Sequence, residues 1–397
     1  MMSLAGRMRV LMAGAGLLLG AGPAFSLDGA DLVAKLNAAM GMSGTPLVVQ
    51  TIDVRGSTVI LRGTTYKPVE TEPAIEIGDI TLEGVEEDNG GYLIESIAFP
   101  DVTATEDKTT VSISDLTMSG ITVPATATGD SLDSIFLYEE ASTGPMVVTE
   151  DGKTVFSFAS SHTATDIAED RSAIGFALEV DGIKADLASV DDTESREALQ
   201  SLELTTIEGT MSMSGSWQAE DGVVDLEEFV FDFANVGKLS MAMSFSGYTM
   251  DFVRAAQDAS TAMQANASKE SQDAASLAML GLMQRLTFNS AEISFQDAGI
   301  TARALDHAGK EQGVSGQDMA QMLKAMTPMV LAQYNVPKLQ NMVSEAVNIY
   351  LDNPGNLTIS AEPANPVPFP MIMGAAMGAP NTLPDVLGVT VEANKRQ

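Results

Sequence analysis

Hydrophobic and polar residues alternate along most of the first half of the chain, from about Leu47 to Phe245. A period of two is typical of strands that have one buried and one solvated face. Three Asp-Gly pairs interrupt this pattern, at residues 151–152, 181–182 and 221–222. Because Asp-Gly favours the tight turns of β-hairpins, we expect each pair to connect two antiparallel strands. The pattern therefore predicts an antiparallel meander.

A recurring break in the alternation predicts that the sheet bends. Ile75 and Ile77 are followed by Ile80 and Leu82, so two residues intervene where one is expected. Such a slip turns the following apolar side chains to the other face unless a β-bulge absorbs the extra residue. The same slip recurs in three further sets: Val111, Ile113, Leu116 and Met118; Val224, Leu226, Phe229 and Phe231; Leu286, Phe288, Ala291 and Ile293. We therefore expect a long, strongly curved sheet whose concave side carries Ile, Leu, Met and Phe.

Before Leu47 and after Phe245, apolar residues recur at helical spacing instead of alternating. This spacing predicts a short helix within residues 27–45 and a helical insert near 249–285 that has a polar middle. Ser315 and Asp318 form a capping box for a further helix, which Pro328 should kink or end. A second helix follows over about 339–351, and closing strands are expected near 357–360 and 389–391.

These elements indicate an α+β, β-dominated fold: a long curved antiparallel sheet with a helical insert and a C-terminal helix pair. The chain divides into four segments: 1–26, a signal peptide; 27–248, the sheet region with its short N-terminal helix; 249–285, the helical insert; 286–397, a strand, the helix pair and closing strands on the same sheet.

The first 26 residues have the features of an export signal. Arg7 and Arg9 precede an apolar stretch over 10–22, which is too short to span a bilayer that requires about 20 residues. Small residues, Ala24 and Ser26, stand three and one positions before Leu27, where we expect cleavage. The mature protein should then be periplasmic and not a transmembrane protein, with an uncleaved anchor as the alternative.

Composition narrows the functions that the chain can have. The net charge is −33, from 54 acidic and 21 basic residues, so the protein repels phosphate backbones and we expect no nucleic-acid partner. The acidity leaves two interpretations open, a saline habitat or a basic partner or cation. With no cysteine, the chain has neither disulfides nor thiolate chemistry, and with two histidines we expect no metal site and no cofactor.

Catalytic chemistry has little support in the sequence. No Gly-x-Ser-x-Gly elbow is present. His162 lies beside two serines, and His307 follows an aspartate in an expected helix, but neighbours in sequence seldom form a triad. We expect no catalytic residues and no enzyme activity.

Methionine is unusually abundant, with 24 residues, whereas aromatic residues make up only 5% of the chain. Flexible thioether side chains adapt to irregular apolar ligands, although they also serve as ordinary core residues. We expect a concave apolar face that holds a hydrophobic ligand, with the helices from Gln317 to Leu351 closing over it. The candidate ligand-binding residues are Met211, Met213, Phe229, Phe231, Met241, Met243, Met322 and Met326.

Two strand segments carry a family resemblance. Residues 113–120 (ISDLTMSG) and 221–229 (DGVVDLEEF) resemble the strands of AsmA-like and YdgA-like bacterial envelope proteins, and residues 297–300 (DAGI) with the methionine-rich helix that follows resemble uncharacterised alphaproteobacterial periplasmic proteins. The resemblance implies a curved β-sheet that cradles acyl chains between membranes. Unlike those proteins, this chain is expected to have no N-terminal transmembrane anchor, and it is shorter than their bridge-forming members; the resemblance assigns no functional residue.

The leading functional hypothesis is therefore a periplasmic protein of the cell envelope that binds a lipid or acyl chain. The alternative is a structural or interaction protein that binds an envelope protein and has a filled core without a ligand pocket. A periplasmic hydrolase comes third, because no catalytic constellation is visible.

Overall fold

The computed structural model describes residues 27–40, 47–66, 74–129, 131–188, 192–265 and 269–395; the expected signal peptide lies outside them. The strands in these residues are β1 (Leu47–Val48), β2 (Thr51–Arg55), β3 (Thr58–Tyr66), β4 (Ile75–Glu83), β5 (Glu86–Asp88), β6 (Gly91–Ala98), β7 (Val102–Glu106), β8 (Thr109–Ile113), β9 (Thr117–Val123), β10 (Glu140–Thr143), β11 (Met146–Glu150), β12 (Lys153–Phe158), β13 (Ser160–Ile167), β14 (Ala173–Asp186), β15 (Thr206–Gln218), β16 (Val223–Phe233), β17 (Gly237–Ser246), β18 (Thr287–Asp297), β19 (Asn356–Ala361), β20 (Val367–Pro368) and β21 (Val389–Ala393). The helices are α1 (Gly29–Met40), α2 (Thr193–Ser201), α3 (Met250–Ala265), α4 (Lys269–Met283), α5 (Ile300–Gln312), α6 (Gly316–Ala332), α7 (Pro337–Asp352), α8 (Phe369–Gly378) and α9 (Leu383–Val386).

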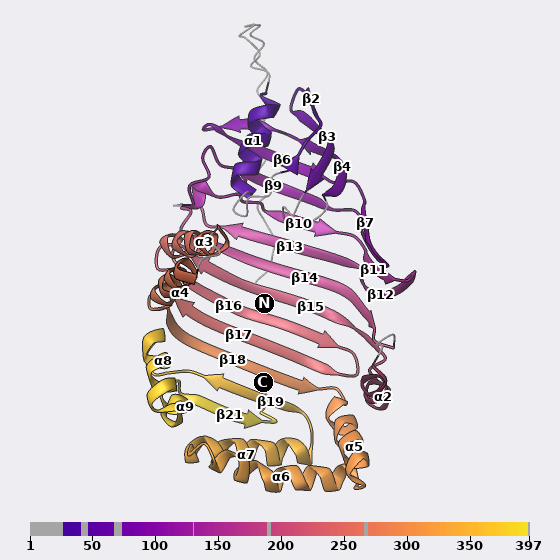
Figure 1. Ribbon diagram of the computed structural model, residues 1–397, viewed down its shortest axis with the longest axis vertical. Coiled ribbons are helices and arrows are strands. Elements are labelled where there is room, and N and C mark those ends of the chain that lie inside the picture. The colour runs from indigo at the N-terminus through magenta and orange to yellow at the C-terminus, as the bar shows by residue number, and fades with distance from the viewer. Residues whose placement is uncertain are drawn as a thin grey trace, which may run out of the picture.

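All the strands belong to one antiparallel sheet that runs the length of the molecule (Figure 1). From β13 to β19 each strand pairs with the next along the chain, and β21 then pairs with β19. The insert of α3 and α4 interrupts this meander between β17 and β18, and α5, α6 and α7 interrupt it between β18 and β19. The expected β-dominated α+β fold with a large antiparallel sheet is confirmed.

A line of breaks crosses the N-terminal half of the sheet. Strands β6 and β7, β9 and β8, β10 and β11, and β13 and β12 each meet end to end, and their breaks lie opposite one another in register. Asp115, at one break, has a positive φ of 53°, which turns the backbone sharply. At the slip between Ile113 and Leu116, where the pattern predicted a bulge or a kink, the chain forms a corner between β8 and β9.

The same line explains one wrong prediction. Asp181 and Gly182 do not form a hairpin turn, because β14 continues through them with a register shift between Val180 and Ile183. The N–H of Ala159, at the break between β12 and β13, donates to the Asp181 carbonyl at 2.8 Å. A neighbouring break in the sheet thus makes this Asp-Gly pair a bulge, whereas Asp151-Gly152 and Asp221-Gly222 form the predicted hairpins.

Bulges also recur in the C-terminal half, where the slips predicted them. Register shifts separate Leu226 from Phe229 in the pairing of β16 with β17. A further shift accompanies the slip after Phe288 in the pairing of β17 with β18. Each bulge returns the following apolar side chains to the same face.

The principal core lies in the N-terminal part, where α1 packs on β2, β6 and β9, and residues of β3 and β4 belong to the same buried cluster. Leu32 of α1 and Val59 of β3 are fully buried, and Leu82 and Ile94 are almost fully buried. The amphipathic helix expected within 27–45 forms as α1, because its spacing places Leu32, Leu36 and Ala39 on this core.

The C-terminal helices lie at the end of the sheet beyond β21 (Figure 1). The predicted capping box of α6 forms between Ser315 and Asp318, but α6 continues through Pro328 instead of ending there. α7 packs along β21 and covers the edge of the sheet, and α6 packs on α5 and α7. This position protects an unpaired strand edge, so the helices cap the sheet instead of covering its face.

Candidate functional site

Six strands of the C-terminal half present one continuous apolar face. Residues directly opposite in an antiparallel pair share a face of the sheet, so the register identifies the members. We call these residues the apolar sheet face. Its central row is Met213, Phe229, Met241, Ile293, Ile359 and Val391, and the flanking rows are Met211, Phe231, Leu239, Phe295 and Leu357 on one side and Leu226, Met243, Ala291, Ala361 and Val389 on the other.

Solvent reaches the middle of this face. Met243 is 42% exposed, Ile293 48% and Ile359 45%, although each lies on a strand with neighbours on both sides. Interior apolar residues of a covered sheet are usually almost fully buried. The helices of the described residues therefore leave this part of the face uncovered.

A cluster of aromatic rings lies at one end of the apolar sheet face. The Trp217 indole N–H donates to the Tyr248 carbonyl at 2.8 Å, and the rings of Trp217 and Phe245 contact the Tyr248 ring at centroid distances of 6.2 and 6.1 Å. Phe252 of α3 completes the group and is buried. The start of the helical insert thus packs here, beside the apolar sheet face.

The opposite face of the same strands is polar. The hydroxyl groups of Ser294 and Thr358 are hydrogen-bonded at 3.0 Å, and the Ser360 hydroxyl donates to Glu292 at the same distance. This alternation of apolar and polar faces follows the sequence pattern directly. Its functional consequence is that the exposed apolar residues all lie on one side.

The structure brings together six of the eight predicted ligand-binding residues. Met211, Met213, Phe229, Phe231, Met241 and Met243 all belong to the apolar sheet face, and the rings of Phe229 and Phe231 lie 4.6 Å apart. Met322 and Met326 lie apart from them on α6, where they are 40% and 49% exposed. The expectation that the helices from Gln317 to Leu351 close over this face is wrong, because they lie at the edge of the sheet.

Sequence reasoning missed Ile293 and Ile359, the two most exposed residues of the central row. Both were visible as alternating positions in expected strands. Their importance arises from pairing between β18 and β19, which are separated in sequence by three helices. Alternation marks the apolar side of a strand but not which strands become neighbours.

The two histidines lie on different elements, β13 and α5. His162 is exposed on β13. The Ser201 hydroxyl lies 2.7 Å from His307 Nδ1 and 2.9 Å from the Ala198 carbonyl oxygen, and its single proton can be donated to only one of them at a time. His307 Nε2 lies 3.7 Å from the Glu311 carboxylate. No cluster of three or more potential metal ligands is found in the described part of the chain.

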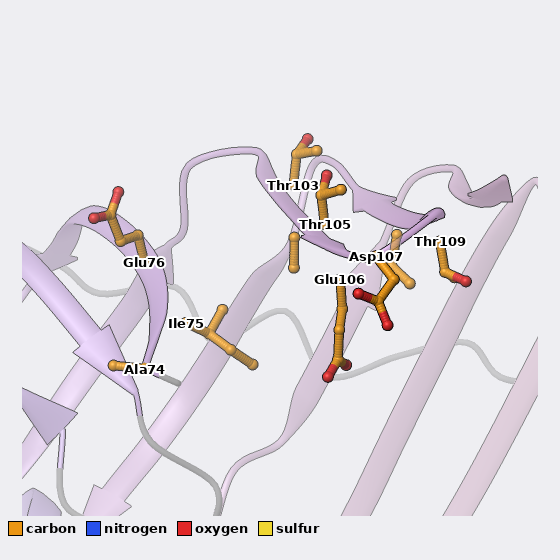
Figure 2. Close-up of a pocket in the computed structure, with 10 residues that line it drawn as sticks. Ala74, Ile75, Glu76, Thr103, Thr105, Glu106, Asp107 and Thr109 are labelled. Carbon is orange, nitrogen blue, oxygen red and sulfur yellow. The ribbon is translucent and has the colours of Figure 1, made fainter. Parts of the chain in front are cut away.

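An open cleft of about 720 Å³ lies between β4 and β7, in the other half of the molecule (Figure 2). Ala74, Ile75 and Glu76 line one wall, and residues 103–107 with Thr109 and Val111 line the other. Figure 2 shows Ile75 directed toward Glu106 and Asp107, whose carboxylates extend into the space. Three carboxylates and three threonines are among the lining residues, so the cleft and the apolar sheet face are different kinds of surface.

Comparison with known proteins identifies one matching family model. It is described as "Uncharacterized protein" and matches residues 230–394, which is less than half of the chain. No curated protein matches this chain. The matched segment includes four strands of the apolar sheet face, β17, β18, β19 and β21, and it leaves the resemblance to AsmA-like and YdgA-like proteins a prediction.

Within the described residues, no helix is both long enough and apolar enough to cross a bilayer.

Proposed function

We propose that this protein binds the acyl chain of a lipid on the apolar sheet face, as a non-enzymatic protein of the bacterial periplasm. The exposure of Met243, Ile293 and Ile359 in the middle of an apolar sheet carries the proposal. Exposed apolar surface of this continuity is unfavourable in water and is typical of a surface that binds an apolar partner.

The dimensions of the face suit an acyl chain. Its central row crosses six strands, which span about 24 Å at about 4.8 Å per inter-strand spacing. One acyl chain fills about half of a bilayer core that is roughly 30 Å thick. If the face removes about six methylene groups from water, at about 0.8 kcal/mol each, the gain is about 5 kcal/mol. That gain corresponds to a dissociation constant on the order of 0.1–1 mM.

Charge limits the headgroup. The net charge of −33 repels anionic lipids at long range, so the proposal favours an acyl chain on a zwitterionic or uncharged headgroup. Octanoyl-lysophosphatidylcholine, whose short chain keeps it monomeric at millimolar concentration, is therefore a suitable probe, and the anionic lysophosphatidylglycerol with the same chain is its comparison.

The test compares two methionines that are almost equally exposed. Met243 lies on the apolar sheet face and is 42% exposed, whereas Met322 lies on α6 and is 40% exposed. We expect Met243→Asp to weaken binding of lysophosphatidylcholine at least tenfold, because a carboxylate enters the apolar contact. We expect Met322→Asp to bind as the unsubstituted protein does. Native mass spectrometry gives the bound fraction, and circular dichroism verifies that both variants fold.

A folded Met243→Asp variant that keeps its lipid would contradict the proposal. The same spectra, recorded on protein purified from its own periplasm, give the mass of the mature chain. A mass that matches a chain beginning at Leu27 supports the export signal, and a mass that still includes residues 1–26 contradicts it.

One observation favours the alternative function, an interaction protein of the envelope. Along α6, Met322, Leu323 and Met326 are 40–49% exposed and Met329 is 63% exposed, and Tyr334, just after the helix, is 66% exposed. Those on α6 recur at helical spacing, and α6 lies at the end of the molecule, beyond β21 and α7 (Figure 1). A chain that remains free of lipid throughout the titration would favour this second function.

A further inference from the structure

Two unpaired strand edges face each other across the cleft between β4 and β7. β4 pairs with β6 only through residues 81–83, so no strand of the described residues pairs with the β7 side of residues 75–79. β7 pairs with β8 on one side, and its other edge has no partner in the described part of the chain. Unpaired edges of this kind are templates for an added strand.

Pro100 explains why the edges separate. The Phe99 N–H donates toward β9, to the Leu116 carbonyl at 3.1 Å, and Pro100 has no N–H with which to continue the ladder to β4. A Cβ placed on Gly78 would lie 3.2 Å from Pro100 Cγ, so the two strands touch at this point. Beyond it they diverge, and the open cleft lies between their remaining residues.

The register of the β7–β8 hairpin identifies the free backbone groups. Glu106 pairs with Thr109 across the two-residue turn Asp107-Lys108, and this closing pair exchanges hydrogen bonds. Alternate residues then direct their backbone groups outward, so Thr103 and Thr105 present their N–H and C=O groups to the cleft. At about 3.3 Å per residue, β7 offers an edge of about 16 Å.

Charge indicates what kind of strand the cleft accepts. The carboxylates of Glu76, Glu106 and Asp107 line it, and among the described residues that line it none is basic. The nearby Lys108 ammonium group lies 2.8 Å from Asp151, in the neighbouring hairpin turn. A segment that carries Lys or Arg therefore complements the walls, whereas an acidic segment is repelled.

We propose that the cleft between β4 and β7 is a strand-addition site, which binds an extended, lysine- or arginine-bearing segment of a partner protein along the free edge of β7. Backbone hydrogen bonds to Thr103 and Thr105 supply the pairing, and the three carboxylates select the basic sequence. The site is independent of the apolar sheet face, so either can fail without the other.

The test uses an acetylated and amidated seven-residue peptide of alternating Val and Lys, with a Val and Glu peptide for comparison. We expect the Val-Lys peptide to bind and Thr105→Pro to weaken it at least tenfold, because proline removes the outward N–H without breaking a bond to β8. Thr105→Val is the matched control. It also loses the contact between the Thr105 and Thr110 hydroxyl groups, 3.1 Å apart, but it keeps the N–H and should bind normally.

A second pair of variants separates the site from general attraction to an acidic protein. Glu106→Gln with Asp107→Asn removes two charges from the cleft, and Glu86→Gln with Glu87→Gln removes two from the exposed strand β5. We expect the first pair to weaken the Val-Lys peptide about fivefold or more and the second to leave it unchanged, measured by isothermal titration calorimetry at 0.15 M salt.

Three results would overturn the proposal: no binding of the Val-Lys peptide, equal binding by Thr105→Pro and Thr105→Val, or equal weakening by the two charge pairs. Equal binding of the Val-Glu peptide would remove the part of the proposal that concerns charge. Circular dichroism of each variant verifies that a loss of binding is not a loss of fold.

Discussion

Tyr92 shows how a single residue joins the N-terminal helix to the sheet. Its ring is 2% exposed beneath α1, and its hydroxyl donates to the Asp31 carboxylate at 2.7 Å. The Lys35 ammonium group contacts the same oxygen, Asp31 Oδ2, at 2.5 Å. Burial raises the pKa of the Tyr92 phenol, and the hydrogen bond to Asp31 raises it further. Hydrogen bonds from Lys35 and Tyr92 hold the pKa of Asp31 below its ordinary value.

The raised pKa of Tyr92 makes stability depend on alkaline pH. Because the folded state holds the phenolic proton more tightly than the unfolded state, this contribution is complete below about pH 10 and is lost as the pH rises above it. We expect the urea midpoint of unfolding to fall between pH 9.5 and about pH 11, and Tyr92→Phe to remove part of that fall. Equal pH profiles for the two proteins would show that Tyr92 does not couple to folding.

At the scale of elements, the breaks between neighbouring strands determine whether an Asp-Gly pair forms a hairpin turn or a bulge. Gly182 has a φ of +65°, and a Cβ there would lie 2.8 Å from the Ala159 Cβ. Gly152 has a φ of +77° in a true hairpin turn, and a Cβ there would have no atom within 4 Å. The two glycines therefore share their backbone conformation and differ in their surroundings.

This difference predicts unequal costs for the same substitution. Gly152→Ala should lower the free energy of unfolding by about 1–2 kcal/mol, the cost of a left-handed conformation with a side chain. Gly182→Ala should cost about 1–3 kcal/mol more, because the added methyl group also displaces Ala159. The effect of alanine on the unfolded chain is the same at both sites and cancels. Urea unfolding measures both values, and equal costs would mean that the bulge accommodates a side chain freely.

The elements that the sequence predicted correctly are those that local chemistry determines. The capping box at Ser315 and the hairpin at Asp151-Gly152 depend on residues within a few positions. The bulge at Asp181-Gly182 was mistaken for a turn because the cause lies at Ala159, on another strand. The expected position of Met322 over the apolar sheet face was wrong for the same reason. α6 packs on α7, and α7 packs on the edge strand β21, from which it is separated in the chain by 36 residues.

At the scale of the whole molecule, packing is unequal along the sheet. The cluster of buried residues around α1 lies at one end, and the apolar sheet face with its half-exposed rows lies toward the other (Figure 1). Local opening is easiest where few apolar contacts must be broken. We therefore expect amide hydrogen exchange to be slowest in β3, β4 and β9, and faster in β17, β18 and β19.

A bound acyl ligand should reduce the difference in amide hydrogen-exchange rate between the two ends of the sheet. With octanoyl-lysophosphatidylcholine at about ten times its dissociation constant, binding stabilises the closed form by about 1.4 kcal/mol, which corresponds to roughly tenfold slower exchange. We expect this slowing around Met243, Ile293 and Ile359 and no change around Leu82 or Ile94, because only the first three residues lose exposed apolar surface. The Met243→Asp variant should lose the effect. Slowing spread evenly over both ends would indicate general stabilisation of the sheet, and slowing confined to α6 would place the lipid on its exposed methionines instead.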